Sequence, residues 1–397
     1  MFIIQNMRVG IGASTEQDHL KAVKEAAGKA RIGLNAGKID LALLFTTREF
    51  SHSLVLRAIA DIIGPIPLFG ASSSAVISGQ GALKHGLAII LFSFSESTYF
   101  NVDCVKDIAE ENTLSAGVQL GEKLLYGCKN ARRNLSVIFS NIDTPDSSGL
   151  ITGLQQKLGK SFPLIGATVG HQGNSLYFNS EILHNSSCGI LWGGKLNFNL
   201  GIEHGWQPLG KPRQITKATA DVVNEIDGLP AVNLYKEYFA KEIPELKREL
   251  KRIAVFYPLG ISISEKKEYL LRSVVSIRND GSLVFRGEVP EGSTIRLMIS
   301  SKEGCLLSAR KAAQAAIKNM EGRKIELALI FNSLSRHTLL GRQATQEIKT
   351  VQETLGEDVP LAGIYTATEQ APLGFINYSL GKTYIHNNSI AILTIAN

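Results

Sequence analysis

The chain has 397 residues, of which 44% are hydrophobic and 20% are charged, so it is long enough for a large buried core and two domains. Its formal net charge is +6, but the only dense basic run, residues 241–252, mixes Lys and Arg with Glu. Such mixing favours an exposed helix face, so we expect no nucleic-acid partner. No segment approaches the roughly 20 apolar residues of a membrane span, and residues 1–6 lack the basic region of a secretory signal. We therefore expect a cytoplasmic protein with no membrane span.

Three parts of the chain share one order: an apolar strand, a helix-length segment, Pro-Leu-x-Gly and a closing strand. The first part has its strands at residues 41–45 and 87–92 and its Pro-Leu-x-Gly at residues 67–70. Between them, residues 51–63 carry an apolar stripe at helical spacing, which predicts an amphipathic helix. Repetition at this scale indicates duplicated structural units.

The second part has strands at residues 137–139 and 189–192, a helix at residues 146–158 and Pro-Leu-x-Gly at residues 163–166. A strand that crosses through a helix to a second strand favours a parallel, right-handed arrangement.

In the third part the strands are residues 327–331 and 389–393, the helix is residues 338–355, and Pro-Leu-x-Gly is residues 360–363. We predict an α/β fold in which repeated strand-helix-strand units form mixed sheets in two domains.

A different pattern separates the second and third parts. Asn279-Asp280-Gly281, between two apolar runs, is a strong hairpin signal. We place the domain boundary at residue 230, so that residues 1–230 hold two units and residues 231–397 hold the third. The second domain would then need residues 269–299 to complete its sheet.

The usual signatures of enzymes are missing from the sequence. Residues 205–211 read G-x-x-x-x-G-K, but Pro212 follows and supplies neither a hydroxyl nor an N–H group for phosphate binding. No nucleophile elbow, His-Glu-x-x-His or dinucleotide fingerprint occurs. The four cysteines are scattered, which predicts no zinc or disulfide framework. We therefore expect no enzymatic activity and no catalytic residue.

The loops that follow each Pro-Leu-x-Gly are rich in small hydroxylated residues: residues 71–74, 167–171 and 364–369. In parallel sheets, ligands bind beyond the carboxyl ends of the strands, where such loops lie. Ser and Thr beside Gly also build ordinary turns, and both interpretations stay open.

Histidine recurs near the closing strands. His184-Asn185 precedes the second closing strand and His386-Asn387 precedes the third, while His204 stands before Gly205-Trp206. A neutral imidazole can bind a metal or haem iron. A turn in which His bonds the backbone explains the pattern equally well.

Longer motifs occur in both halves of the chain. A first group comprises residues 40–45, 69–73, 205–210 and 225–231; a second group comprises Arg336, residues 340–341 and 359–366, Glu369, and residues 371–372 and 386–387. At these motifs the chain resembles the FIST proteins, whose N-terminal and C-terminal modules occur together in bacterial sensory proteins. Two positions depart from the usual pattern, since Ser333 stands where many members have Cys and Thr368 where many have Gly.

The resemblance implies a sensory input protein that binds a small ligand. One branch of similar form binds haem, senses nitric oxide and controls a partner histidine kinase or a cyclic-di-GMP enzyme, a diguanylate cyclase or phosphodiesterase. We predict haem as the ligand of this chain, coordinated by one of His184, His204 and His386. The remaining predicted ligand contacts are Ser72, Ser73, Thr168, Arg336, Tyr365, Thr366 and Glu369.

Two alternatives stay open. In the first, the ligand is an amino acid or similar small metabolite, with its carboxylate on Arg336 and its ammonium group on Glu369. In the second, the chain is a scaffold that binds only proteins.

Overall fold

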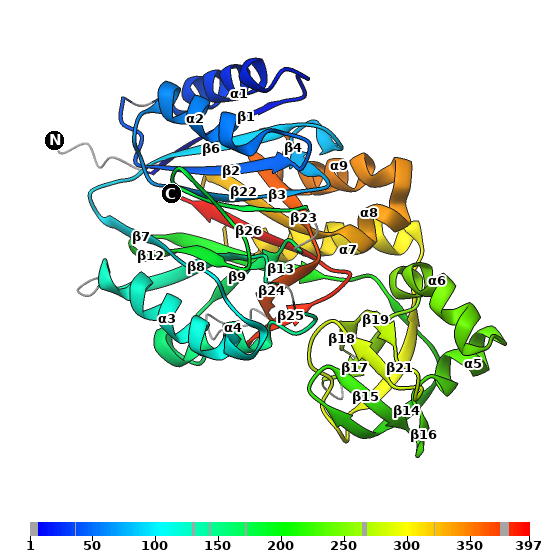
Figure 1. Ribbon diagram of the computed structural model, residues 1–397. Coiled ribbons are helices and arrows are strands. Elements are labelled where there is room, and N and C mark those ends of the chain that lie inside the picture. Colours follow the sequence, from blue (N-terminus) through cyan, green and yellow to red (C-terminus); the bar gives the residue numbers. More distant parts are fainter. Residues whose placement is uncertain are drawn as a thin grey trace.

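The computed structural model describes residues 7–35, 37–128, 132–142, 144–170, 173–263, 268–320, 322–373 and 381–397. Figure 1 shows a large α/β body and a smaller β-rich part, which projects from the body at the lower right of the view. The predicted α/β class with mixed sheets is confirmed. Among the described residues, no helix has the length and apolarity needed to cross a membrane.

Three units of the same design build the body. The first contains β1 (Arg8–Ser14), α1 (His19–Leu34), β2 (Leu41–Thr47), α2 (His52–Ile63), β3 (Leu68–Ser73), β4 (Val76–Ser78), β5 (Gly81–Leu83) and β6 (Leu87–Ser93). The second contains β7 (Thr98–Val105), α3 (Thr113–Tyr126), β8 (Arg133–Ser140), α4 (Ser148–Leu158), β9 (Leu164–Thr168), β10 (Leu176–Phe178), β11 (Glu181–Leu183) and β12 (Ser187–Gly194).

The third unit begins with β13 (Asn197–Glu203) and resumes only after residue 300. It continues with α7 (Lys302–Ile317), β22 (Ile325–Ser333), α8 (Leu334–Leu340), α9 (Ala344–Leu355), β23 (Leu361–Thr366), β24 (Thr368–Pro372), β25 (Thr383–His386) and β26 (Ile390–Ala396). The single helix predicted at residues 338–355 is two helices, because Gly341 adopts a φ of 57° that ends α8.

The units are joined by an exchange of hairpins. The β10–β11 hairpin of the second unit pairs with β3 of the first, and β24–β25 of the third pairs with β9 of the second. The β4–β5 hairpin of the first unit closes the ring by pairing with β23 of the third. Each six-stranded sheet therefore contains strands from two units.

The glycine of each Pro-Leu-x-Gly is required by a close approach of two backbones. A Cβ atom at Gly70, Gly166 or Gly363 would lie 1.9–2.1 Å from a carbonyl oxygen of the neighbouring parallel strand. The repeated motif thus marks the same contact, between the two parallel strands, in every unit.

A shared apolar core lies where the three sheets face one another. Phe45, Phe139 and Phe331 come from the corresponding strands β2, β8 and β22. The ring centroids of Phe45 and Phe139 lie 5.6 Å apart, and those of Phe139 and Phe331 lie 5.7 Å apart. Helices cover the outer faces of the sheets (Figure 1).

The β-rich part is an insertion between β13 and α7. It consists of β14 (Gln207–Thr219), β15 (Val222–Ile226), β16 (Leu229–Pro230), α5 (Asn233–Phe239), α6 (Ile243–Phe256), β17 (Leu259–Ser262), β18 (Tyr269–Arg272), β19 (Val274–Ile277), β20 (Leu283–Phe285) and β21 (Thr294–Ile299). Its strands form a sheet of their own around a separate apolar core. We call it the inserted domain.

The expectation that residues 269–299 complete the sheet of the third unit is wrong. That sheet is completed by β13 and by the β4–β5 hairpin, both of which precede residue 205 in the chain. The boundary placed at residue 230 falls between β16 and α5, within the inserted domain, and it stays a prediction about domain organisation.

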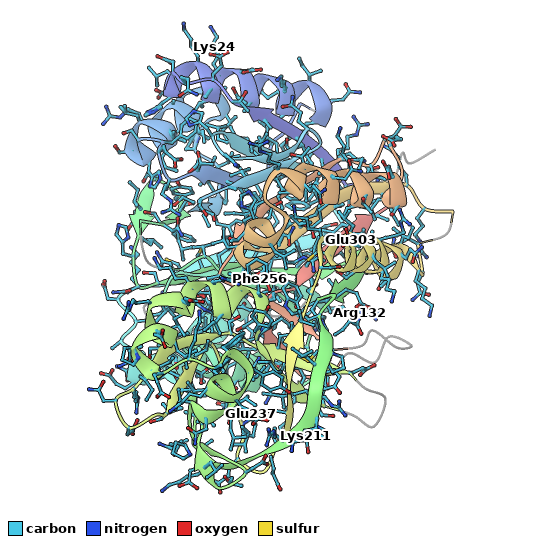
Figure 2. The ribbon with its side chains drawn as sticks, turned by 90° about the vertical axis from the view of Figure 1, so that its right-hand side faces the viewer. Lys24, Arg132, Lys211, Glu237, Phe256 and Glu303 are labelled. Atoms are coloured by element: carbon cyan, nitrogen blue, oxygen red, sulfur yellow. The ribbon has the colours of Figure 1, made fainter. Side chains whose placement is uncertain are left out.

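The inserted domain packs against the third unit through a small apolar cluster. Trp206, Leu271 and Met298 meet Cys305 of α7 and Leu340 of α8 there. Phe256, at the end of α6, contacts the same cluster and lies at the level where the two parts meet in Figure 2. Polar contacts join the two parts beside this cluster.

Candidate functional site

The three exchanged hairpins can be compared residue by residue, because each pairs with the strand that contains the Pro-Leu-x-Gly glycine. Leu176 pairs with Ala71, and Glu369 pairs with Ala167; both alanines follow that glycine directly. Glu369 of the third hairpin therefore corresponds to Leu176 of the second. In the first hairpin the same position is Val76, paired with Ile364.

The residue opposite Glu369 is also polar, in contrast to its counterparts in the other two hairpins. Glu369 pairs across its hairpin with His386, whereas Leu176 pairs with Leu183 and Val76 with Leu83. Glu369 and His386 are both buried. Two hairpins thus place apolar pairs at this position, and the third places an acid beside an imidazole.

Burial keeps the Glu369 carboxyl group protonated. It raises the pKa of Glu369 to about 8, against the opposing effect of a hydrogen bond from Thr366 Oγ1 at 2.7 Å. The backbone N–H of Ser389 donates to the second carboxyl oxygen at 3.1 Å. At neutral pH, Glu369 is therefore a largely neutral acid inside the protein.

His386 is also neutral, for the same reason. Burial lowers the pKa of His386 to about 3, and its Nε2–H donates to the Ala371 carbonyl at 3.0 Å. Nδ1 is therefore the ring nitrogen that carries a lone pair.

Arg286 of the inserted domain lies within electrostatic range of Glu369. Burial lowers the pKa of Arg286, and the charge of Glu369 acts in the opposite direction. The side chain is half-buried, and its guanidinium makes no hydrogen bond or ion pair with Glu369 or with any other residue that the structure describes. A cation whose donors are not used by any described residue can accept a negatively charged group.

Hydrogen bonds hold the inserted domain to the turn that follows His386. Ser273 donates from its backbone N–H to Asn387 Oδ1 and from its hydroxyl to Asn388 Oδ1, both at 2.8 Å. Asn387 Nδ2, which is buried, has no acceptor among the described residues. The Arg272 guanidinium donates to the Ile385 carbonyl at 3.0 Å. The site thus lies where the third unit meets the inserted domain.

Arg336 is close to Glu369 but is occupied by the protein. It is buried, and its guanidinium donates to Glu347, to Ser308 Oγ and to the carbonyls of His204 and Cys305. Glu347 is equally buried and also accepts from Asn332 Nδ2 at 2.6 Å. Arg336 therefore ties α8 to α7, α9 and the end of β13.

Tyr365 lies on the helix-covered face of the third sheet. Its ring contacts that of His337 at 4.7 Å, and burial raises the pKa of its hydroxyl. Neither that hydroxyl nor Asn332 Oδ1 has a partner among the described residues. Thr366 is the one predicted loop residue that bonds Glu369 directly.

The other predicted loop residues connect the units. Ser73 donates to the Tyr365 carbonyl, Ser72 accepts from the Ser175 backbone N–H at 2.7 Å, and Thr168 shares a hydrogen bond with Ser140 at 2.9 Å. The predicted loops are therefore neighbours in the ring, but only the third contributes to the Glu369 site. His171, in the second of these loops, lies outside the described residues.

The three histidines predicted as haem ligands do not come together. His204 accepts from the Trp206 N–H at Nδ1, and the Tyr269 backbone acts against the lowering of its pKa by burial. His184 is exposed, in the second unit. Of the three, His386 has a ring nitrogen without a hydrogen bond to a described residue and is also buried.

The repeated His-Asn is out of register by one residue. In the hairpins, His386 corresponds to Leu183, so His184 corresponds to Asn387. Because side chains alternate between faces, one residue is enough to place His386 inside and His184 outside. The sequence repeat therefore does not mark equivalent sites.

Models of two protein families match this chain. The FIST N domain matches residues 40–229, and the FIST C domain matches residues 231–372. The chain is a FIST protein. FIST domains are sensory domains of signal transduction that bind small ligands. The predicted family membership is confirmed, and Glu369 and Arg286 both lie within the FIST C match.

Relatives of this FIST protein are distant in sequence. An uncharacterized protein of Mycobacterium tuberculosis is 24% identical over 388 residues, covering 95% of this chain and 98% of the relative. An uncharacterized protein of Methanocaldococcus jannaschii is 24% identical over 288 residues, covering 66% of this chain and 55% of the relative. Among solved structures, the cyanuric acid hydrolase from A. caulinodans has 9% identity and a TM-score of 0.41, covering 98% of this chain and 99% of the hydrolase.

Sequence reasoning found Glu369 and His386 but missed Arg286. Arg286 follows the short strand β20, and nothing in its local sequence distinguishes it from other surface arginines. Only the packing of the inserted domain against the third hairpin brings Arg286 within electrostatic range of Glu369.

Proposed function

We propose that this FIST protein senses a small zwitterionic metabolite, of which an amino acid is the simplest, bound between Glu369 and Arg286. The observation that supports this proposal is the buried Glu369–His386 pair within electrostatic range of a cation whose donors no described residue uses. A ligand carboxylate would bind Arg286 in a bidentate manner, and a ligand ammonium group would bind Glu369. The donor Asn387 Nδ2, which no described residue accepts from, would bond a further ligand oxygen.

Binding of an ammonium group would ionise Glu369. The carboxyl group, with its pKa of about 8, would lose its proton because an adjacent positive charge favours the charged form. The ligand would then be held by two complementary charges out of water. It would also bridge the third unit and the inserted domain, so its binding energy would favour one arrangement of the two parts.

The test is a thermal-shift screen of the protein against the common amino acids, followed by calorimetric titration of the best one. A ligand specific to the native state raises the melting temperature. We expect Glu369→Gln and Arg286→Gln each to weaken binding by about tenfold or more, since each loses a charge-assisted contact. Arg278→Gln, an exposed position of the inserted domain, is the control and should bind normally.

Proton release provides an independent measurement. Titration at pH 7 in buffers of different ionisation enthalpy should show a proton released as Glu369 ionises. A protein that no amino acid stabilises, or a ligand whose affinity is the same in all three variants, would contradict the proposal.

Haem binding with nitric-oxide sensing is the second candidate, and His386 supports it. A ligating histidine usually donates its other ring N–H to a backbone carbonyl, as His386 does to Ala371. Haem would supply an iron that binds the gas. Reconstitution with haem should give an absorption band that is lost in His386→Leu; a protein that stays colourless would remove this candidate.

The proposed output is the control of a partner in the cytoplasm, a sensor histidine kinase or a cyclic-di-GMP enzyme. The support is the sensory role of FIST domains. The measurement is the activity of a candidate partner with and without this protein and its ligand. A partner whose activity does not change would contradict this assignment.

A further inference from the structure

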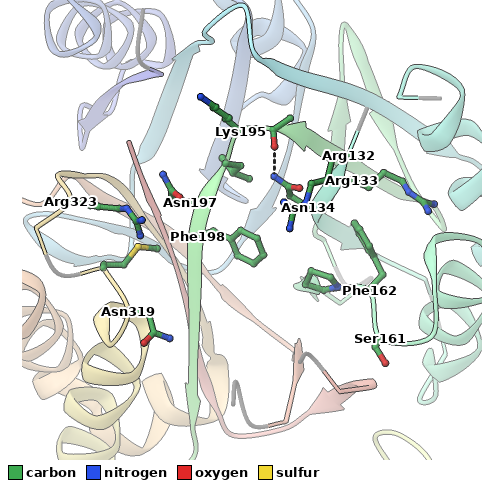
Figure 3. Close-up of a pocket in the computed structure, with 14 residues that line it drawn as sticks. Arg132, Arg133, Asn134, Ser161, Phe162, Lys195, Asn197, Phe198, Asn319 and Arg323 are labelled. Carbon is green, nitrogen blue, oxygen red and sulfur yellow. Dashed lines mark hydrogen bonds between the residues drawn. The ribbon is translucent and has the colours of Figure 1, made fainter. Parts of the chain in front are cut away.

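A hollow of about 690 Å³ lies at the end of the second unit that is remote from Glu369. Its walls come from residues 132–134 at the start of β8, residues 161–163 before β9, residues 194–198 around the β12–β13 connection, and Asn319, Met320 and Arg323 after α7. Figure 3 shows Arg323 on one side of the hollow and Arg132 and Arg133 on the other. The length of β8, roughly 23 Å at 3.3 Å per residue, separates this hollow from the Glu369 end.

The charged residues that the structure describes in the lining of the hollow have one sign. Arg132, Arg133, Lys195 and Arg323 are all exposed, and none of the described lining residues is acidic. The guanidinium groups of Arg132, Arg133 and Arg323 make no ion pair with any residue that the structure describes. A concave surface lined by one charge concentrates its potential and attracts ions of the opposite charge.

The corresponding corner between the first and second units differs in charge. It is also lined by the residues that precede β2 and by the β6–β7 connection, and its charged residues are Arg8, Lys38, Asp40 and Glu96. Lys38 pairs with Asp40 at 2.7 Å, so that corner is neutral in sum. The positive charge is therefore a property of one corner and does not follow from the repeated architecture.

We propose that this basic hollow binds a nucleoside polyphosphate. Its volume lies within the roughly 300–1,000 Å³ of sites for small molecules and cofactors. Arginine forks match the geometry of phosphate oxygens, and four cationic side chains suit a ligand with several negative charges. The ring of Phe162 lines the same hollow and offers an aromatic surface for a base.

The experiment is calorimetric titration of the full chain with ATP at physiological salt. The variant Arg133→Ser/Arg323→Ser removes one cation from each side of the hollow. We expect it to weaken ATP binding at least about tenfold, as expected for lost charge-assisted contacts. The control Lys21→Ser/Lys24→Ser removes the same net charge from exposed positions of α1 and should change the affinity by less than about twofold, because exposed charges beyond the ~8 Å screening length contribute little.

Two further ligands separate the phosphate and base contributions. Adenosine, which lacks phosphate, should not bind, and inorganic tripolyphosphate should bind more weakly than ATP. Absence of saturable ATP binding, or equal loss in both double variants, would overturn the site. Equal affinity for ATP and tripolyphosphate would overturn the nucleoside assignment. The melting temperatures of the two double variants show whether both remain folded.

Discussion

The second and third hairpins have the same backbone pairing and different chemistry. In β10–β11, Leu176 and Leu183 oppose each other inside the protein; in β24–β25, Glu369 and His386 occupy the corresponding positions. Packing alone is satisfied by the leucine pair, so the ring does not need an acid or an imidazole there. Burying two polar groups costs free energy that an apolar pair would not. The third hairpin thus retains a costly pair where the inserted domain adds Arg286, and we interpret that difference as the mark of the ligand site.

The largest effect expected from disturbing the third unit concerns the ion pair beside the site. Glu347→Leu leaves the buried Arg336 without its anion, and we expect a loss of about 3–5 kcal/mol in the free energy of unfolding. Urea unfolding measures this loss. Glu353→Leu, an exposed position on the same helix α9, should change the stability by less than about 0.5 kcal/mol. Equal stability of the two variants would show that the pair is not needed.

The glycines test what the units share. Gly166→Ala and Gly363→Ala each place a Cβ atom about 2 Å from a backbone carbonyl oxygen, and we expect each to cost about 1–3 kcal/mol. The second and third units should respond alike, because their strand contact is the same. Gly79→Ala, where an added Cβ meets nothing within 4 Å, serves as the control in the same unfolding experiment. A Gly363→Ala variant as stable as the unaltered protein would show that the strand contact in the third unit differs from that in the second.

Stability should depend on pH in a way specific to the third hairpin. Burial raises the pKa of Glu369 from its ordinary value of 4.5 to about 8, so the folded protein holds this proton more tightly than the unfolded chain. The contribution of Glu369 to stability is therefore fully present below pH 4.5 and declines as the pH rises to about 8.

His386 acts in the opposite direction. Burial lowers the pKa of His386 from 6.5 to about 3, so its contribution is present above pH 6.5 and declines as the pH falls toward 3. Unfolding curves across this range should lose the decline above pH 4.5 in Glu369→Gln and the decline below pH 6.5 in His386→Leu. If both variants show the same dependence of stability on pH as the unaltered protein, Glu369 is not buried as a protonated acid and His386 is not buried as a neutral imidazole.

The smallest stability change is expected when the third hairpin is converted to the second. In Glu369→Leu/His386→Leu, the gain from apolar burial offsets the loss of the hydrogen bonds to Glu369 and His386. We expect the free energy of unfolding to stay within about 2 kcal/mol of the original. A variant that fails to fold would show that the pair is needed for the structure itself.

The sequence predicts the repeated units because each satisfies local rules. The Pro-Leu-x-Gly motifs, the amphipathic stripes at residues 51–63 and the apolar strands specify strand, helix and strand without reference to the rest of the chain. The sequence does not predict which strand each hairpin pairs with. A hairpin such as β10–β11 is apolar on its inner face wherever it pairs, so its partner is decided by closure of the ring.

Only part of the site could be predicted from the sequence, because local patterns do not show which distant segments pack together. Glu369 and His386 stand in motifs of the third unit, whereas Arg286, which lies within electrostatic range of Glu369, belongs to the inserted domain, more than 80 residues earlier in the chain. The repeated His-Asn does not mark equivalent positions, because its two copies are offset by one residue in the hairpin pairing. The face that each residue occupies follows from this pairing, which the sequence does not show. Arg336 was predicted to bind a ligand, but its donors are directed to protein acceptors that come from α7, α9 and the end of β13.

The most direct test of the ligand site is the affinity of the hairpin-converted variant Glu369→Leu/His386→Leu for the amino acid that most stabilises the unaltered protein. Calorimetric titration of both proteins, with their melting temperatures recorded in parallel, separates binding from folding. Our account predicts a folded variant that no longer binds. A folded variant that binds with unchanged affinity would contradict it and would place the ligand elsewhere in the molecule.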